Sequence, residues 1–332
     1  METIAIDKIQ TATLTVLRTL FEPGQSVALL DFPDHFNAGD HLIWLGQLKY
    51  LKQLSVQVDY TADPLRYDAA ILRDLVPDGP ILLTGGGNLG DRWTVDQDFR
   101  ERVIQDFPDR QIIQLPQSVD FSDESPRLTA AKSIFGAHPD LTILIRDTVS
   151  LRKARAWFPT CRVVFCPDLA FGVGALKPAG KASVDVLYLK RADSESIPEN
   201  GYLPSSGVTV RQRDWEIGSA PQWHYLHIPA AFAMQFPKLG RRLQPTVAKF
   251  YEKISAAAVN RAIANLSDGT VVVTDRLHAT ILAVLIGREV AAFDNANGKV
   301  RAIYEDYLNI APGVTFLESQ AEATAFVESS IS

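Results

Sequence analysis

Residues 81–91 read ILLTGGGNLGD, a short apolar run that changes abruptly into glycines and an aspartate. An apolar run of this length, bounded by turn residues, predicts a buried strand. The same order, a strand-like run followed by a polar turn and an amphipathic stretch, recurs on both sides of these residues. The sequence therefore predicts an α/β fold.

Strand-like runs and longer amphipathic stretches alternate along most of the chain. Strands are predicted at Ser26–Phe32, Val56–Tyr60, Ile81–Thr84, Gln111–Leu115, Leu141–Ile145, Arg162–Phe165, Val184–Leu189, Thr270–Thr274 and Val290–Phe293. Helices are predicted before Ser26 and at His41–Leu54, Pro64–Leu75, Val95–Phe107, Arg127–Phe135, Val149–Trp157, Thr246–Leu266, His278–Ile286 and Val300–Tyr307. Short connections between them indicate mostly parallel sheets that are covered on both faces.

A stretch rich in glycine and proline, from Gly172 to Lys181, predicts a linker between two domains. The chain of 332 residues is long enough for two domains of roughly 150 residues each. We expect Rossmann-like domains at residues 1–175 and 181–332, with parallel sheets that face each other across a cleft. The segment Arg191–Trp223 interrupts the alternation, and its length predicts a binding loop, a lid or disorder.

The composition excludes several classes of protein. With 33 Lys+Arg against 39 Asp+Glu, the net charge of −6 argues against non-specific nucleic-acid binding. Two cysteines, Cys161 and Cys166, are too few for a disulfide framework or a tetrathiolate zinc site. They fit a reducing cytoplasm, although their spacing leaves a bridge between them open.

No secretory signal is recognisable, because the first twenty residues mix charged with apolar side chains. The most apolar stretch, Ala279–Gly287, has about half the length that is needed to span a bilayer. We expect a cytoplasmic protein, or one that is peripheral at the inner face of the membrane. Arg241 and Arg242 could contact anionic lipid there, although a solvated helix start is the favoured interpretation.

The motifs that carry chemistry follow predicted strands, at the edge where ligands bind in open α/β sheets. The first is Asn37-Ala38-Gly39-Asp40. Gly39 permits close backbone approach, and Asp40 can cap the following helix. The start of that helix can also bind a phosphate or carboxylate, so the motif is either a simple cap or an anion site.

The second motif is Gly85–Asp91. Its glycines match the spacing of a dinucleotide fingerprint, but they follow a third strand rather than the first. The next strand leads to Gln114 and Gln117, where a ribose-binding acid would be expected. We therefore expect the glycines to present backbone N–H groups to a different anionic or sugar ligand.

Two further motifs contain arginine. Arg146, followed by Asp147 and Ser150, can hold a carboxylate or phosphate in a bidentate fork, or can simply pair with a nearby acid. In Asp275-Arg276-Leu277-His278, the arginine can bind an anion while the histidine transfers a proton beside it.

Weaker signals follow other strands. Pro167-Asp168 and Asp294-Asn295 lie at strand ends, and Lys299 at a helix start could contact a phosphate. The histidines at positions 35, 41, 224 and 227 form no recognisable metal-ligand set, so no metal is expected. Neither a Gly-x-Ser-x-Gly elbow nor a Walker A loop is present.

Taken together and in this order, the motifs resemble the polysaccharide pyruvyl transferase family over about residues 26–310. The resemblance is carried by Asn37–Asp40, Gly85–Asp91, Arg146-Asp147 with Ser150, Pro167-Asp168 and Asp275–Ala279. It implies a GT-B-like pair of Rossmann-like domains, phosphoenolpyruvate as donor and a saccharide as acceptor. The product would be a pyruvate ketal on two hydroxyls, in exopolysaccharide or cell-surface glycan biosynthesis, with no separate cofactor.

Carried over to this chain, the resemblance implies that Arg146, Arg276, Leu277 and Lys299 bind the donor and that His278 and Arg276 are catalytic. The cleft would be lined by Asn37, Gly39, Asp40, Gly85, Gly86, Gly87, Asn88, Asp91, Asp168, Asp275 and Asn295.

Two other functions stay open on the sequence alone. A GT-B glycosyltransferase that uses a nucleotide sugar would share the fold but would need a pocket for the base. The other function is that of a non-catalytic sensor, which would have retained the cleft but would no longer turn over a substrate. The sequence does not specify the acceptor sugar, its lipid or nucleotide carrier, or the oligomeric state.

Overall fold

The computed structural model describes residues 2–191, 195, 197, 201–215 and 237–331, and within these it contains two sheets whose strand pairs are all parallel. The first sheet has the order β2-β1-β3-β5-β6-β7, with β4 paired to β5. Its strands are β1 (Ser26–Leu30), β2 (Gln57–Ala62), β3 (Ile81–Leu83), β4 (Gly86–Gly90), β5 (Ile112–Asp120), β6 (Leu141–Ile145) and β7 (Arg162–Phe165). The second sheet has the order β12-β11-β10-β8-β9. Its strands are β8 (Val184–Leu189), β9 (Val210–Arg213), β10 (Gly269–Thr274), β11 (Glu289–Phe293) and β12 (Val314–Leu317).

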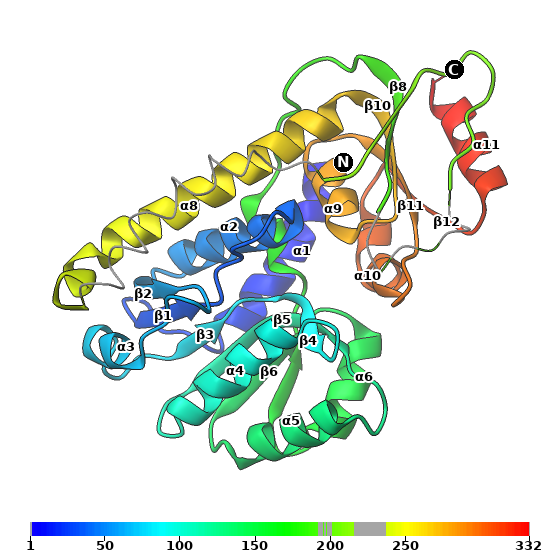
Figure 1. The fold of residues 1–332 in the computed structure, drawn as a ribbon. Helices are drawn as coiled ribbons and strands as arrows, with labels where there is room; N and C mark the ends of the chain where they lie inside the picture. Colours follow the sequence, from blue (N-terminus) through cyan, green and yellow to red (C-terminus); the bar gives the residue numbers. More distant parts are fainter. Residues whose placement is uncertain (1, 192–194, 196, 198–200, 216–236, 332) are drawn as a thin grey trace.

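Helices connect the strands and cover the sheets (Figure 1). They are α1 (Glu2–Leu17), α2 (Ala38–Gln53), α3 (Ala69–Leu75), α4 (Thr94–Asp106), α5 (Pro126–Ala137), α6 (Thr148–Trp157), η1 (Leu169–Val173), α8 (Pro237–Ser267), α9 (Leu277–Leu285), α10 (Lys299–Asp306), η2 (Leu308–Ile310) and α11 (Gln320–Ile331). Several begin at a side chain that accepts a hydrogen bond from the first turn, as Asn37 does for α2 and Asp147 for α6.

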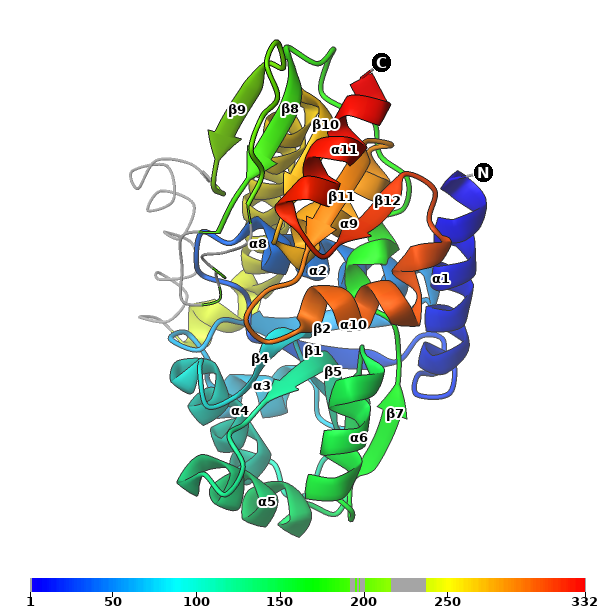
Figure 2. The ribbon, with the colours of Figure 1, turned by 90° about the vertical axis from the view of Figure 1, so that its right-hand side faces the viewer.

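Alternate side chains of each strand face opposite sides of its sheet. The side chains on the facing sides of the two sheets belong to one shared core. Val27 and Leu29 of β1 belong to a core that also contains residues of α1, α2, α8, α9 and the second sheet. Ala28 and Leu30 face a second core, under α3, α4, α5 and α6. Helix α11 covers the outer face of the second sheet. Figure 2 shows the two sheets one above the other.

Helix α8 follows the predicted linker in sequence but packs mainly against α2 and β2, on the side of the first sheet. In Figure 1 it runs from the second sheet along α2 toward β2 and α3. The ring of Tyr251 stacks on that of Phe32 with centroids 3.9 Å apart, and Ser255 Oγ lies 3.0 Å from His41 Nδ1. The boundaries at 175 and 181 stay a prediction, and the apolar core between the sheets is continuous across them.

The predicted α/β architecture with two parallel sheets is confirmed, with differences in detail. Residues 86–90, which follow the predicted strand Ile81–Thr84, form a further strand, β4, because glycines at positions 85 and 90 allow its backbone to lie against Pro116 and Asp120 of β5. The sequence did not predict β9, β12 or α11. The segment Arg191–Trp223 holds β9, and much of it lies outside the described residues, as do His224 and His227.

Two further expectations concern cysteines and membranes. Cys161 and Cys166 are both free thiols, so the bridge that their spacing left open is not formed. Within the described ranges, no helix combines the length and the apolar character that a bilayer span needs.

Candidate active site

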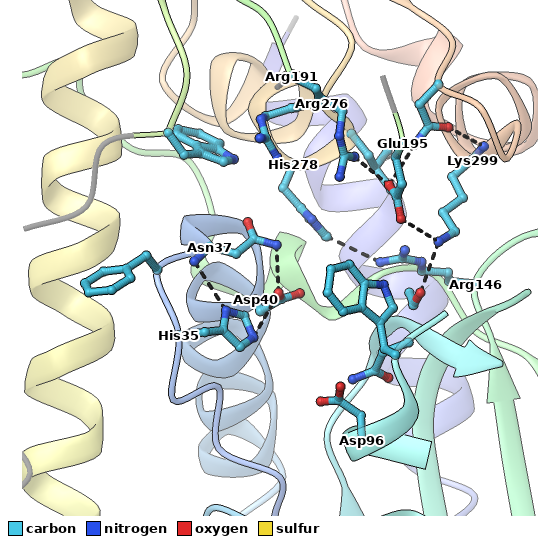
Figure 3. Close-up of a pocket in the computed structure, with 17 residues that line it drawn as sticks. His35, Asn37, Asp40, Asp96, Arg146, Arg191, Glu195, Arg276, His278 and Lys299 are labelled. Carbon is cyan, nitrogen blue, oxygen red and sulfur yellow. Dashed lines mark hydrogen bonds and ion pairs between the residues drawn. The ribbon is translucent and has the colours of Figure 1, made fainter. Parts of the chain in front are cut away.

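A cavity of about 420 Å³ lies between the two sheets, at the carboxyl ends of their strands (Figure 3). The first sheet contributes residues after β1, in β4, before and in α4, and after β6. The second sheet contributes residues that follow β8, β9, β10 and β11. The lining residues are His35, Phe36, Asn37, Asp40, Gly87, Asn88, Trp93, Asp96, Arg146, Arg191, Glu195, Trp215, Arg276, Leu277, His278, Asn295 and Lys299.

Arg146 and His278 meet across the cavity, one from each sheet (Figure 3). Arg146 Nη1 donates to Asp168 Oδ2 at 2.6 Å, and Arg146 Nε donates to Ser118 Oγ at 2.9 Å. His278 Nε2 lies 3.3 Å from the same Asp168 oxygen and 3.4 Å from Arg146 Nη1. Asp168 therefore orients both the guanidinium and the imidazole.

Asp168 is buried, and it also accepts a hydrogen bond from Ala170 N at 2.8 Å at the start of η1. Burial alone would raise the pKa of this carboxyl, but the neighbouring Arg146 and His278 outweigh burial and hold the pKa well below its usual range. The carboxylate is therefore a fixed negative charge behind the arginine and the histidine.

The approach of His278 to helix α2 requires a glycine. A Cβ atom on Gly39, in the first turn of α2, would lie 2.5 Å from His278 Nδ1 and 2.7 Å from its Cβ. Gly39, which was predicted to permit a close approach, is thus the residue against which His278 of the second sheet packs. Helix α2 is capped by Asn37 and not by Asp40 as predicted, because Asn37 Oδ1 accepts from Gly39 N at 3.0 Å and Asn37 Nδ2 donates to Asp40 at 2.7 Å.

Lys299 approaches the glycine-rich strand from the start of α10. Its Nζ donates to the carbonyl of Gly87 at 3.0 Å and lies 3.5 Å from Glu195 Oε1. Burial lowers the pKa of Lys299, and the charge of Glu195 opposes that shift. Glu195 also contacts Arg191 Nη1 at 2.6 Å and accepts from Asn295 Nδ2 at 3.2 Å.

Arg276 lies at the start of α9 and forms a two-point pair with Asp214. Its Nε donates to Asp214 Oδ1 at 2.6 Å and its Nη2 donates to Oδ2 at 2.8 Å. With Arg146, Arg191 and Lys299, it makes four cationic side chains in the described lining of one cavity, each in contact with a carboxylate. Such a set can receive a small ligand that carries two anionic groups.

The structure brings most of the predicted residues together. Asn37, Asp40, Gly87, Asn88, Arg146, Arg276, Leu277, His278, Asn295 and Lys299 all line the cavity. Gly85 lines an adjoining cavity instead.

The other predicted cleft residues lie around the cavity rather than in its lining. Gly39 and Asp168 support His278, as described above. Gly86 adopts a φ of 150°, which favours glycine. Asp91 accepts from Ser122 N and Ser125 Oγ at the start of α5, and buried Asp275 accepts from Arg191 N at 2.9 Å.

Several lining residues were missed by sequence reasoning: His35, Phe36, Trp93, Asp96, Arg191, Glu195 and Trp215. His35, Phe36 and Trp93 lie next to motifs that were recognised, so their position along the chain was the available signal. Arg191, Glu195 and Trp215 belong to the segment that broke the predicted alternation. No local pattern distinguishes them, because they reach the cavity only through the packing of β8 and β9.

The dinucleotide interpretation of residues 85–90 is unsupported by the geometry. The fingerprint needs a strand, a glycine turn and a helix in direct succession. Here the glycines form strand β4, and α4 begins only at Thr94. The backbone N–H of Asn88 donates to Gln117 Oε1 at 3.2 Å, whereas the carbonyl of Gly87 receives Lys299. Gly87 thus leaves room for Arg146 and Lys299, since a Cβ there would lie 3.0 Å from Arg146 Nη2 and 3.1 Å from Lys299 Nζ.

Comparison with known proteins agrees with the motifs. The model of the family described as polysaccharide pyruvyl transferase matches residues 37–297. Pyruvyl transferase 1 of Schizosaccharomyces pombe is 30% identical over 313 residues, covering 89% of this chain and 73% of the relative. The putative pyruvyl transferase EpsO of Bacillus subtilis is 30% identical over 298 residues, covering 89% of this chain and 90% of the relative.

A solved structure shows the same fold. The crystal structure of a functionally uncharacterized protein from Klebsiella pneumoniae aligns with a TM-score of 0.60 at 19% identity, over 94% of this chain and 99% of that one. The family expected from the sequence motifs is confirmed by the family model and by the two relatives. The chain belongs to the polysaccharide pyruvyl transferase family and is a transferase.

Proposed function

We propose that this transferase moves the enolpyruvyl group of phosphoenolpyruvate onto two hydroxyls of a saccharide, forming a pyruvate ketal. The observation that carries the proposal is the convergence of Arg146, Arg276 and Lys299 on one cavity beside His278. Phosphoenolpyruvate presents a carboxylate and a phosphate on a three-carbon frame, and guanidinium forks match both groups.

The chemistry requires two additions at C2 of the donor. A saccharide hydroxyl adds to C2 while C3 receives a proton and becomes a methyl group. The C2–O bond to phosphate then breaks, phosphate leaves with the bonding electrons, and a second hydroxyl adds to C2. Each hydroxyl loses its proton on addition, and one of these protons ends on the departing phosphate. His278 would transfer one of the protons, a role worth roughly 10²–10⁴-fold in rate.

The biological setting we propose is exopolysaccharide or cell-surface glycan assembly in the cytoplasm. Family membership supports the glycan, and the unbridged thiols of Cys161 and Cys166 support a reducing compartment. A lipid-linked acceptor would bring the protein to the membrane surface. Arg241, one of the two arginines considered for lipid contact, pairs with Asp74 of α3.

Calorimetric titration with phosphoenolpyruvate tests the donor. We expect wild type to bind with a micromolar to low-millimolar dissociation constant, and Arg276→Ala to weaken binding at least about tenfold because a guanidinium contact to an anion is lost. Arg146→Ala would remove the arginine partner of the buried Asp168 carboxylate and endanger the fold. Arg146→Lys keeps a positive charge beside Asp168 and removes only the fork.

Arg127→Ala is the matched control, because Arg127 pairs with Asp98 on the outer helices. It should leave donor binding unchanged. If wild type does not bind phosphoenolpyruvate but binds uridine diphosphate, the proposal is contradicted and a nucleotide-sugar glycosyltransferase is favoured.

A further inference from the structure

A second cavity, of about 300 Å³, adjoins the first and has a different chemical character. His35, Asp40, Asn88 and Asp96 line both cavities, which makes them neighbours. Its carboxylates come from Asp31, Asp34, Asp40, Asp63 and Asp96, and its described lining includes no lysine or arginine. The first cavity suits an anionic ligand, whereas this one suits a ligand that brings hydrogen-bond donors.

Asp31 is the unusual member of this lining. Its side chain is 7% exposed, and it makes no hydrogen bond or ion pair with any described residue. By contrast, Asp63 accepts from Arg66 Nη1 at 2.6 Å and from Tyr251 Oη at 2.5 Å. A buried carboxyl without a protein partner costs stability, so a ligand that supplies the partner is a physical reason for its presence.

The backbone at Asp31 points to the same conclusion. Its φ is 68°, in the left-handed region that a non-glycine residue rarely adopts. Such positions cluster at ligand sites, although aspartate adopts this region more readily than most side chains, so the backbone adds to the case that the cavity makes.

The fold places Asp31 where open α/β sheets bind ligands. Leu30 of β1 is in register with Ala62 of β2 on one side and with Leu83 of β3 on the other. In the sheet, β2 lies on one side of β1 and β3 lies on the other side, so the strand order reverses at β1. Asp31, Asp63 and Thr84 follow these three strands, and the crevice at such a reversal is a preferred ligand site.

The rim of the two cavities is apolar and exposed. Eight large hydrophobic side chains are exposed among the described residues, and half of them line these cavities: Phe36, Leu65, Trp93 and Val95. Pyranose rings combine an apolar C–H face with hydroxyls at the edge. The combination of apolar rim and acidic wall therefore matches a sugar.

We propose that this second cavity is the acceptor subsite and binds a neutral pyranose, with Asp31 hydrogen-bonded to its hydroxyls. The inference rests on the proposed function, since the donor would occupy the adjoining cationic cavity. We expect a uronic acid or a sugar phosphate to bind less well than a neutral sugar, because the described lining of this cavity contains no lysine or arginine to pair with its charge. A cation is not the occupant we favour, because no group of three potential ligands in the described chain has metal-binding geometry.

Saturation-transfer NMR with methyl glycopyranosides tests the subsite. Probes are the gluco, galacto and manno compounds, with methyl galacturonide as the charged counterpart, all measured with phosphoenolpyruvate present. Asp31→Gly is the deciding variant, because glycine accepts the positive φ without strain. We expect at least one neutral probe to bind wild type, the uronide to bind less well, and Asp31→Gly to raise the dissociation constant at least about tenfold.

Glu124→Gly is the matched control. Glu124 is an exposed acidic residue with a φ of 60° that lines neither cavity, so its replacement should leave probe binding unchanged. Equal binding to wild type and Asp31→Gly, or equal binding of the uronide, would overturn the inference. Calorimetry with phosphoenolpyruvate on the same samples separates the two proposals. If wild type binds phosphoenolpyruvate but none of the neutral probes, the subsite alone is refuted. If wild type does not bind phosphoenolpyruvate, the proposed donor is refuted.

Discussion

At the scale of single residues, His278 is the group best placed to transfer a proton. It faces Arg146 inside the cavity and is oriented by Asp168, which is buried and negatively charged. We predict that His278→Ala lowers the turnover number about 10²–10⁴-fold and leaves the dissociation constant of phosphoenolpyruvate within a few-fold of wild type. Phosphate release and calorimetry measure the two quantities. Near-normal turnover in the variant would exclude the role, and His278→Gln, which keeps polar contacts, should resemble the alanine variant.

Asp31 makes a second prediction at this scale, on stability. The pKa of Asp31 is raised from 3.8 to about 8. Burial is the largest cause and the charge of Asp96 is the next. The charges of Asp40 and Asp63 add to the shift, and the charge of Arg100 opposes it. The folded state therefore keeps a proton that the unfolded chain has lost, and the free energy of unfolding falls as pH rises from about 4 to about 8. Asparagine cannot titrate and tolerates a positive φ.

Asp31→Asn should therefore gain stability relative to wild type, and the gain should grow as the pH is raised. Denaturant melts of both proteins at about pH 5, 6.5 and 8 measure it. A constant difference across this range would show that Asp31 does not keep its proton in the folded state. A variant that is more stable but binds saccharide less well would be an example of stability given up for function.

At the scale of elements, the first turn of α2 and the start of α9 must approach closely. Gly39→Ala would normally favour a helix, by up to about 1 kcal/mol. Here the new Cβ would overlap His278, so we expect the imidazole to move and turnover to fall at least about tenfold. The control is Gly136→Ala in α5, where a Cβ would meet only Thr160 Oγ1, at 3.4 Å. That variant should keep full activity, and equal activity in both variants would show that the approach to His278 has no catalytic importance.

At the scale of the whole molecule, α8 joins the two sheets through a common core. Tyr251 stacks on Phe32 and donates to Asp63. We predict that Tyr251→Ala costs about 3–5 kcal/mol of unfolding free energy, because a large buried ring is lost. Tyr251→Phe, which keeps the ring, should cost about 1–3 kcal/mol.

The same core predicts that both halves unfold together. Calorimetry of wild type should show one transition, because the core that contains α1, α2, α8, α9 and residues of both sheets is continuous between the two halves. Two separated transitions, with Tyr251→Ala affecting only one, would support independent domains at residues 1–175 and 181–332 instead.

The amino-acid sequence by itself determined most of the strands, their parallel arrangement and the family. Runs such as residues 81–84 and 270–274 identify buried strands because side-chain periodicity is a local property. The motifs that follow them, from Asn37 to His278, are found at the edge where parallel strands end, so most of the cavity lining could be predicted.

Only the tertiary structure decided which distant residues meet. The sequence places Asp31 inside the predicted strand Ser26–Phe32 with nothing to distinguish it, and its burial without a partner depends on how β1, β2, β3 and α4 pack. Glu195 reaches Lys299 across 104 positions of sequence, and Gly39 reaches His278 across 239. Contacts of this range depend on how the two sheets stack through their shared core, and local propensity and periodicity carry no information about that stacking.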